Sequence, residues 1–194
     1  MKHGFILALG ACALALSACG SKTDTETTAT NSGSVTDIST DTDNGTENAT
    51  VAVPAMSGQE FADAAASTDA YEIEAGKLAE QKATDQKLKD FGKMMVDNHT
   101  TSTAKLKAAA GKADPAITPN PKLDPEQSGN LEALRAATGA DFDALYKQQQ
   151  VAAHQKALAA MKGYGETGSV PQLKDFASDT ASIVQTHLDK ILGL

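Results

Sequence analysis

Apolar residues recur every three to four positions in four long segments of the chain, which is the spacing of one face of an α-helix. These segments cover residues 57–82, 85–110, 141–164 and 170–192. From residue 57 onward no stretch of the sequence alternates apolar and polar residues with a period of two, so no strand is predicted. This part of the chain is therefore expected to be all-α.

Residues at the ends of these segments agree with the helical prediction. Ser57, followed three residues later by Glu60, has the pattern of a capping box at the start of the first helix. Thr84 suits the N-cap of the second helix, and Pro171 suits the first turn of the fourth.

The connections between the predicted helices differ in length. A tight turn joins the first pair and GYGETG (163–168) joins the second pair, whereas the second and third helices are separated by residues 111–140. Within that long connection, residues 124–139 predict a short helix with Asp124 as N-cap. Two hairpins joined by one long crossover predict a ferritin-like four-helix bundle, with simple up-and-down order as the alternative.

Residues 1–18 have the pattern of a secretion signal. A short basic start precedes an apolar run at 4–18, and at about 1.5 Å per residue this run is shorter than the ~30 Å hydrocarbon core of a bilayer. LSACG (16–20) resembles the processing site of bacterial lipoproteins, with Cys19 as the residue that carries palmitate or a related acyl chain. The alternative is secretion without an anchor.

Residues 19–56 would then comprise the lipidated cysteine and a tether. The segment consists mainly of Thr, Ser, Asp and Asn, and its composition offers too little apolar surface to fold. We therefore expect a lipid-anchored protein of the bacterial cell envelope that holds a domain at 57–194 in the periplasm. The residue after the cysteine is Gly20 and not an aspartate, which resembles the pattern of lipoproteins sent to the outer membrane.

Overall charge and missing motifs exclude several function classes. The net charge of −8 and the absence of tryptophan argue against nucleic acid as a partner. After Cys19 the sequence has no cysteine, which excludes disulfides and cysteine-ligated metals in the mature chain. No phosphate-binding loop, nucleophile elbow or H-E-x-x-H motif is present, so the sequence identifies no catalytic residue.

Three histidines and one glutamate fall on or beside the apolar faces, one on each long helix. Counting helix rise from the first turn places Glu72, His99 and His154 in one layer and His187 about 10 Å away from it. The sequence therefore predicts an inner cluster of Glu72, His99 and His154. His187 and the sulfur of Met95, one turn before His99, are further candidate ligands.

Two interpretations of this cluster stay open. Buried histidines in helix bundles are more often hydrogen-bonded neutral groups that fix helix register than metal ligands, and we favour that interpretation. Candidate hydrogen-bond partners are Glu72, Tyr71, Tyr146, Gln150 and Thr180. The alternative is a periplasmic metal-binding or redox site for copper, zinc or iron. The Glu-x-x-His pattern of ferritin di-iron sites is absent, because Val96 and Val184 occupy the glutamate positions.

Four segments of the chain, YEIEAGKLA, FGKMMVDNHT, FDALYKQQQVAAH and LKDFASDTASIVQTHL, resemble the bacterial ferritin-like envelope proteins called domain of unknown function 4142. The resemblance covers residues 57–192 and includes Glu72, His99, His154 and His187 in order. It implies the fold and the envelope location. The family's activity is not established, so we expect an envelope binding or stress-associated module with envelope proteins as partners.

Overall fold

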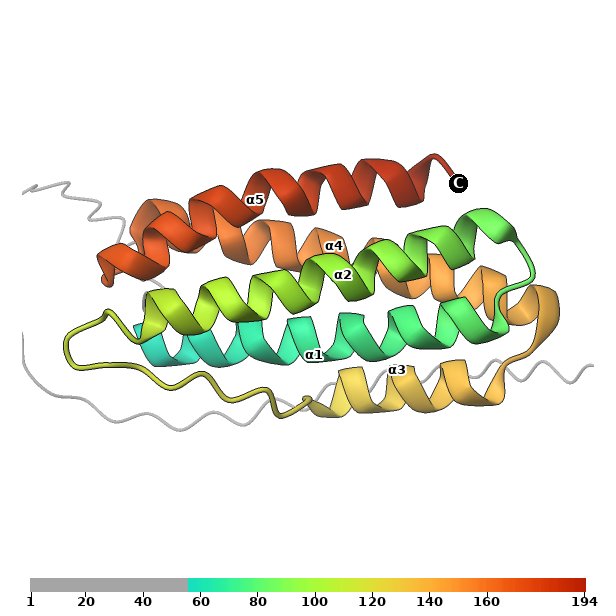
Figure 1. Cartoon of the computed structure of the whole chain (residues 1–194), viewed down its shortest axis with the longest axis horizontal. Coiled ribbons are helices and arrows are strands. Elements are labelled where there is room, and N and C mark those ends of the chain that lie inside the picture. Colours follow the sequence, from blue (N-terminus) through green and yellow to red (C-terminus); the bar gives the residue numbers. More distant parts are fainter. Residues whose placement is uncertain (1–55) are drawn as a thin grey trace, which may run out of the picture. The chain divides into compact units, whose positions relative to one another are not determined.

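The computed structural model describes residues 56–194, so the expected signal, Cys19 and almost all of the tether lie outside the described residues. All regular structure between residues 56 and 194 is helical (Figure 1), which confirms the all-α prediction for this part of the chain. The helices are α1 (Gly58–Lys82), α2 (Gln86–Ala110), α3 (Pro125–Ala136), α4 (Gly139–Thr167) and α5 (Pro171–Leu192). None of these five helices is long and apolar enough to cross a membrane.

The expected helix caps are present with one exception. The Ser57 side chain accepts a hydrogen bond from the backbone of Glu60, whose carboxylate accepts one in return from the Ser57 backbone at 2.9 Å. Asp124 caps α3 in the same reciprocal manner. The N-cap of α2 is Asp85, so the prediction of Thr84 was wrong; Thr84 instead donates hydrogen bonds to the Asp143 carboxylate at the start of α4.

Helix α4 continues into GYGETG (163–168), the segment for which the sequence predicted a turn. It ends at Thr167 and not near residue 164, although glycines in a helix cost about 1 kcal/mol each relative to alanine. Tertiary packing explains the extension, because the Tyr164 ring stacks on Phe61 with ring centroids 3.9 Å apart. A Cβ atom at Gly165 would stand 2.8 Å from the Ser178 hydroxyl, so α5 approaches closely at this glycine.

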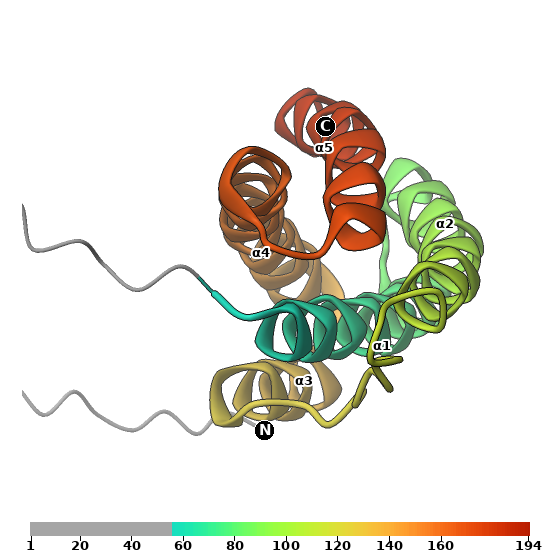
Figure 2. The same cartoon turned by 90° about the vertical axis from the view of Figure 1, so that its left-hand side faces the viewer.

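Four long helices lie side by side, with α1 packed chiefly on α2 and α4 chiefly on α5. Both pairs are antiparallel, whereas α2 and α4 run in the same direction (Figure 1). Helix α3 lies on the outer side of α1 (Figure 2) and contacts α1 and α4. The connection from α2 to α4 therefore runs back along the helices. As a result, α4 starts at the same end as α2 and runs in the same direction.

The interior consists of two apolar clusters separated by a polar layer. One cluster surrounds Phe91, Met95 and Tyr146 near the α1–α2 turn, and the other surrounds Phe61 and Leu106 at the opposite end. Every long helix contributes buried polar residues between the two clusters: Ser67, Asp69, Glu72, His99, Gln149, Gln150, His154 and His187. The polar layer thus interrupts the core at the same height on all four long helices.

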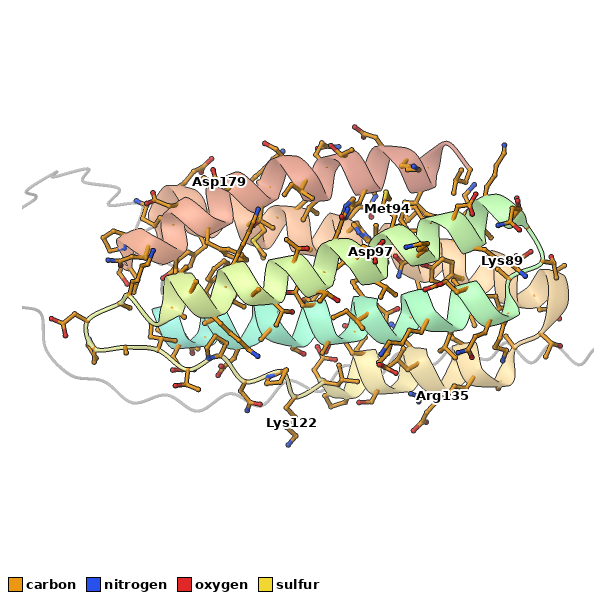
Figure 3. The ribbon with its side chains drawn as sticks, in the orientation of Figure 1. Lys89, Met94, Asp97, Lys122, Arg135 and Asp179 are labelled. Atoms are coloured by element: carbon orange, nitrogen blue, oxygen red, sulfur yellow. The ribbon has the colours of Figure 1, made fainter. Side chains whose placement is uncertain are left out.

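Exposed charges contribute little to this arrangement. Lys122 and Arg135 point away from the helices (Figure 3). The exposed pair Lys93–Asp97, with 2.8 Å between nitrogen and oxygen, is of a kind that stabilises a fold by no more than about 1 kcal/mol. The stability of the domain must therefore come from its interior.

Helices α1 and α2 approach most closely at a pair of glycines. A Cβ atom at Gly76 would lie 2.6 Å from the Gly92 carbonyl oxygen, and one at Gly92 would lie 2.7 Å from the Gly76 carbonyl oxygen. Both obstacles are backbone atoms, which cannot rotate away. The two glycines therefore set the spacing of α1 and α2 beside the polar layer.

We expect Gly92→Ala to destabilise the domain by about 1–3 kcal/mol, because the methyl group must push two helix backbones apart. Gly163→Ala is the matched control, since a Cβ there meets no atom within 4 Å, and it should stabilise the domain by about 0.5–1 kcal/mol through helix propensity. Urea unfolding of both variants measures the difference. Equal effects of the two substitutions would contradict the close helix contact.

Candidate metal centre

Helix α1 supplies a buried carboxylate that holds the ring of His99. One Asp69 oxygen lies 2.8 Å from His99 Nδ1, and the other accepts a hydrogen bond from Thr103 at 3.1 Å. Burial disfavours the charged form of His99, but its hydrogen bond to Asp69 and the charges of Glu72 and Asp69 outweigh this effect and raise its pKa. In the neutral ring Nδ1 carries the hydrogen, because a carboxylate only accepts, and Nε2 keeps its lone pair.

His154 on α4 is fixed in the same tautomer by the backbone. Its Nδ1 donates to the carbonyl oxygen of Gln150, one turn earlier, at 2.8 Å. A carbonyl oxygen can only accept, so Nε2 of the neutral ring carries the lone pair. His154 is 2% exposed, and its Nε2 has no hydrogen-bond partner, as is also true of His99 Nε2.

His187 on α5 is held through Asn98 of α2, whose amide nitrogen lies 2.9 Å from His187 Nε2. A half-turn of that amide would present its oxygen instead, so that Nε2–H donates and Nδ1 keeps the lone pair. His187 Nδ1 is buried without a hydrogen-bond partner. Burial, followed by the charges of His99, His154 and Lys190, lowers the pKa of His187 to about 3, so its ring is neutral at pH 7.

The three imidazoles converge in the polar layer. One ring nitrogen from each of His99, His154 and His187 lies within 4.8 Å of the other two. The centroids of the rings are 5.4–6.1 Å apart. Three nitrogens bound to one tetrahedral ion at about 2.0–2.1 Å would stand about 3.4 Å from one another, so small side-chain rotations suffice to close the set.

The prediction that His187 lies about 10 Å from the other ligands was wrong. It assumed that α4 ends near residue 164, whereas α4 ends at Thr167. Three further helical residues move His154 by about 5 Å relative to the start of α5, which removes half of the expected offset.

The predicted ligand Glu72 lies beside the three histidines and not among them. Its Oε1 is 3.8 Å from His154 Nδ1, and neither carboxylate oxygen has a hydrogen-bond partner. Burial and then the charge of Glu72 raise the pKa of the neighbouring Tyr146, whose hydroxyl is also without a partner. Met95 belongs to the apolar cluster around Phe91.

Sequence reasoning missed the side chains that orient the histidines. Of the expected partners only Gln150 forms a hydrogen bond with a histidine ring, and it does so through its backbone carbonyl. Asp69 was detectable in principle, because it lies three residues before Glu72 and so on the same helix face. Asn98 lies on α2 and His187 on α5, and no local pattern in the sequence links the two residues.

We expect the stability difference between wild type and Asp69→Asn to be larger at pH 6 than at pH 8.5. The raised pKa of His99 stabilises the fold fully below the unfolded-state pKa of about 6.5, and this contribution is lost as the pH rises through the folded-state value. Asp97→Asn, in an exposed ion pair, is the control and should show no such pH dependence. Urea unfolding of metal-free protein at both pH values measures this, and a constant difference would contradict it.

Comparisons with known proteins place the chain in a family. The family model of domain of unknown function 4142 (DUF4142) matches residues 44–194. Searches of curated proteins and of solved structures found no significant match. Since the matched region covers well over half of the sequence and includes all three converging histidines, the chain belongs to the domain of unknown function 4142 family.

Proposed function

We propose that this domain is a metal-binding module that holds one transition metal ion through His99, His154 and His187. The observation that carries the proposal is the convergence of three buried imidazoles, each with one ring nitrogen that has no hydrogen-bond partner. Buried polar atoms are nearly always paired in native proteins, so three unpaired nitrogens on converging rings favour a shared ligand. A metal ion would satisfy all three with one bond each.

The outer contacts of the rings support the same proposal. Histidines that bind metals usually donate their other ring N–H to a carboxylate, a backbone carbonyl or water, which fixes ring orientation and tautomer. Here Asp69 holds His99, the Gln150 carbonyl holds His154, and Asn98 lies in position to hold His187. Each of the three rings is thus oriented before an ion arrives.

The donor set favours zinc or copper over iron. Neutral imidazoles suit both zinc and copper, whereas mononuclear non-haem iron sites typically include a carboxylate. No carboxylate is among the three converging residues of the described chain, and Glu72 lies on the far nitrogen of His154. Three protein ligands also leave a fourth position open, as in catalytic zinc sites.

A polar layer that only fixes helix register is the second candidate function of these residues. Such a layer stabilises one arrangement of helices when its members satisfy one another. In this layer one ring nitrogen of each histidine, both Glu72 oxygens and the Gln150 side-chain amide have no hydrogen-bond partner. The unsatisfied atoms therefore favour the metal-binding proposal.

The proposal also includes the type of helical bundle and the cellular location of the protein. We place the metal site in a ferritin-like four-helix bundle with α3 in its crossover, which the parallel course of α2 and α4 supports. The lipoprotein pattern around Cys19 supports an acylated envelope protein whose domain faces the periplasm, with the outer membrane as the favoured membrane and envelope proteins as partners. Mass spectrometry of the native N-terminus tests the acylation.

We expect purified wild-type protein loaded with zinc or copper to retain one ion per chain. His99→Leu, His154→Leu and His187→Leu should each lose it, because each removes one of three ligands. Glu72→Gln is the matched control: it changes a buried neighbour of His154 and should retain the ion. Metal analysis after gel filtration measures the stoichiometry.

Stability provides a second measurement of the same binding. At a free metal concentration of 100 times the dissociation constant, the ion should stabilise wild type by about 2.7 kcal/mol and the three leucine variants by much less. Circular dichroism establishes that each variant is folded before the comparison. A wild-type protein that gains no stability from either metal, or a His187→Leu variant that gains as much as wild type, would refute the three-histidine site.

A further inference from the structure

A pocket between α2 and α5 leads to the candidate metal centre. It has a volume of about 330 Å³, and the residues that line it include His99, His187, Ser102, Lys105, Thr180 and Ile183. Two of the three candidate ligands therefore form part of its wall. Both are almost completely buried, with exposures of 7% for His99 and 2% for His187, and each has one ring nitrogen without a hydrogen-bond partner.

The pocket adjoins the proposed site, because two of the three candidate ligands line it. Three protein ligands satisfy three positions of a tetrahedral ion, and catalytic metal sites take water or substrate at the fourth. A ligand that enters between α2 and α5 reaches the histidines without passing α1, because no α1 residue lines the pocket. The volume lies at the lower end of the range for ligand sites, which suits a small molecule.

The charges around the pocket favour an anion. Lys105 is the one lysine or arginine that lines it, and no aspartate or glutamate does. Hydroxyl groups of Ser102 and Thr180 add hydrogen-bond donors. The buried carboxylates Asp69 and Glu72 belong to α1 and reduce the net charge of a loaded site, but neither one lines the pocket.

We propose that this pocket binds a small anion, which coordinates the metal ion at its fourth position and is attracted by the Lys105 ammonium group. The proposal rests on the metal-binding function proposed above and adds the chemical class of the exogenous ligand. The anion displaces bound water and donates a lone pair to the ion, with no change of oxidation state. Ser102 and Thr180 hold the end of the anion that the metal does not contact.

Azide titration of copper-loaded protein tests this proposal, because azide bound to Cu²⁺ gives a charge-transfer absorption band that unbound azide lacks. In wild type the band should appear and saturate. Lys105→Ala should weaken azide binding about two- to five-fold, which corresponds to an exposed charge interaction of up to about 1 kcal/mol. Ile183→Trp, which fills the mouth with a larger side chain, should weaken it at least about tenfold.

Matched controls separate the pocket from general surface effects. Lys107→Ala removes an exposed lysine of α2 that does not line the pocket, and Leu192→Trp enlarges an exposed apolar residue of α5 away from it. Both should bind azide as wild type does, and all four variants should retain one copper ion by metal analysis.

The outcomes distinguish failure of the pocket from failure of the metal site. Stoichiometric copper without an azide band, or azide binding that neither Lys105→Ala nor Ile183→Trp weakens, overturns the anion pocket and leaves the metal site standing. A wild-type protein that retains no copper overturns the anion pocket, and it overturns the metal site as well if it retains no zinc. Loss of azide affinity in the two pocket variants, with copper content and both controls unchanged, supports the anion pocket.

Discussion

Burial of ionisable side chains between two apolar clusters is the constraint on which this domain depends. Asp69, Glu72, His99, His154 and His187 are each no more than 7% exposed, and they come from all four long helices. Removing a charged group from water costs several kcal/mol unless partners replace the lost hydration. The helices must therefore meet at one height, because a shift of a single turn would leave each of these groups against an apolar surface.

Other features of the fold keep that height fixed. The Gly76–Gly92 contact brings α1 close to α2, which lets Asp69 reach His99 across the helix pair. The additional residues of α4, anchored by the stacking of Tyr164 on Phe61, bring His154 closer to the level of His187. Both features place glycines within helices, where helix propensity alone disfavours them. Packing around the polar layer thus overrides local preference at each of these positions.

The sequence predicted the helices well and the site in part, and the difference has a physical cause. Apolar periodicity and capping residues are local, so four long helices and the short helix after Asp124 could be read from residues that are neighbours in the chain. His99 could be placed because a short turn fixes the register of α1 and α2. His187 was misplaced because its register depends on where α4 ends, which a contact with the distant Phe61 decides.

The side chains that orient the histidines were harder to predict for a related reason. An aspartate such as Asp69 is usually solvated, and only the approach of α2 makes it a partner of His99. The central claim is that three imidazoles and one exchangeable ligand surround a metal ion in this layer. X-ray absorption spectroscopy of the zinc-loaded protein tests it most directly. The account predicts three imidazole nitrogens and one further light-atom ligand from solvent, and loss of one imidazole in His187→Leu; a spectrum without three imidazoles would contradict it.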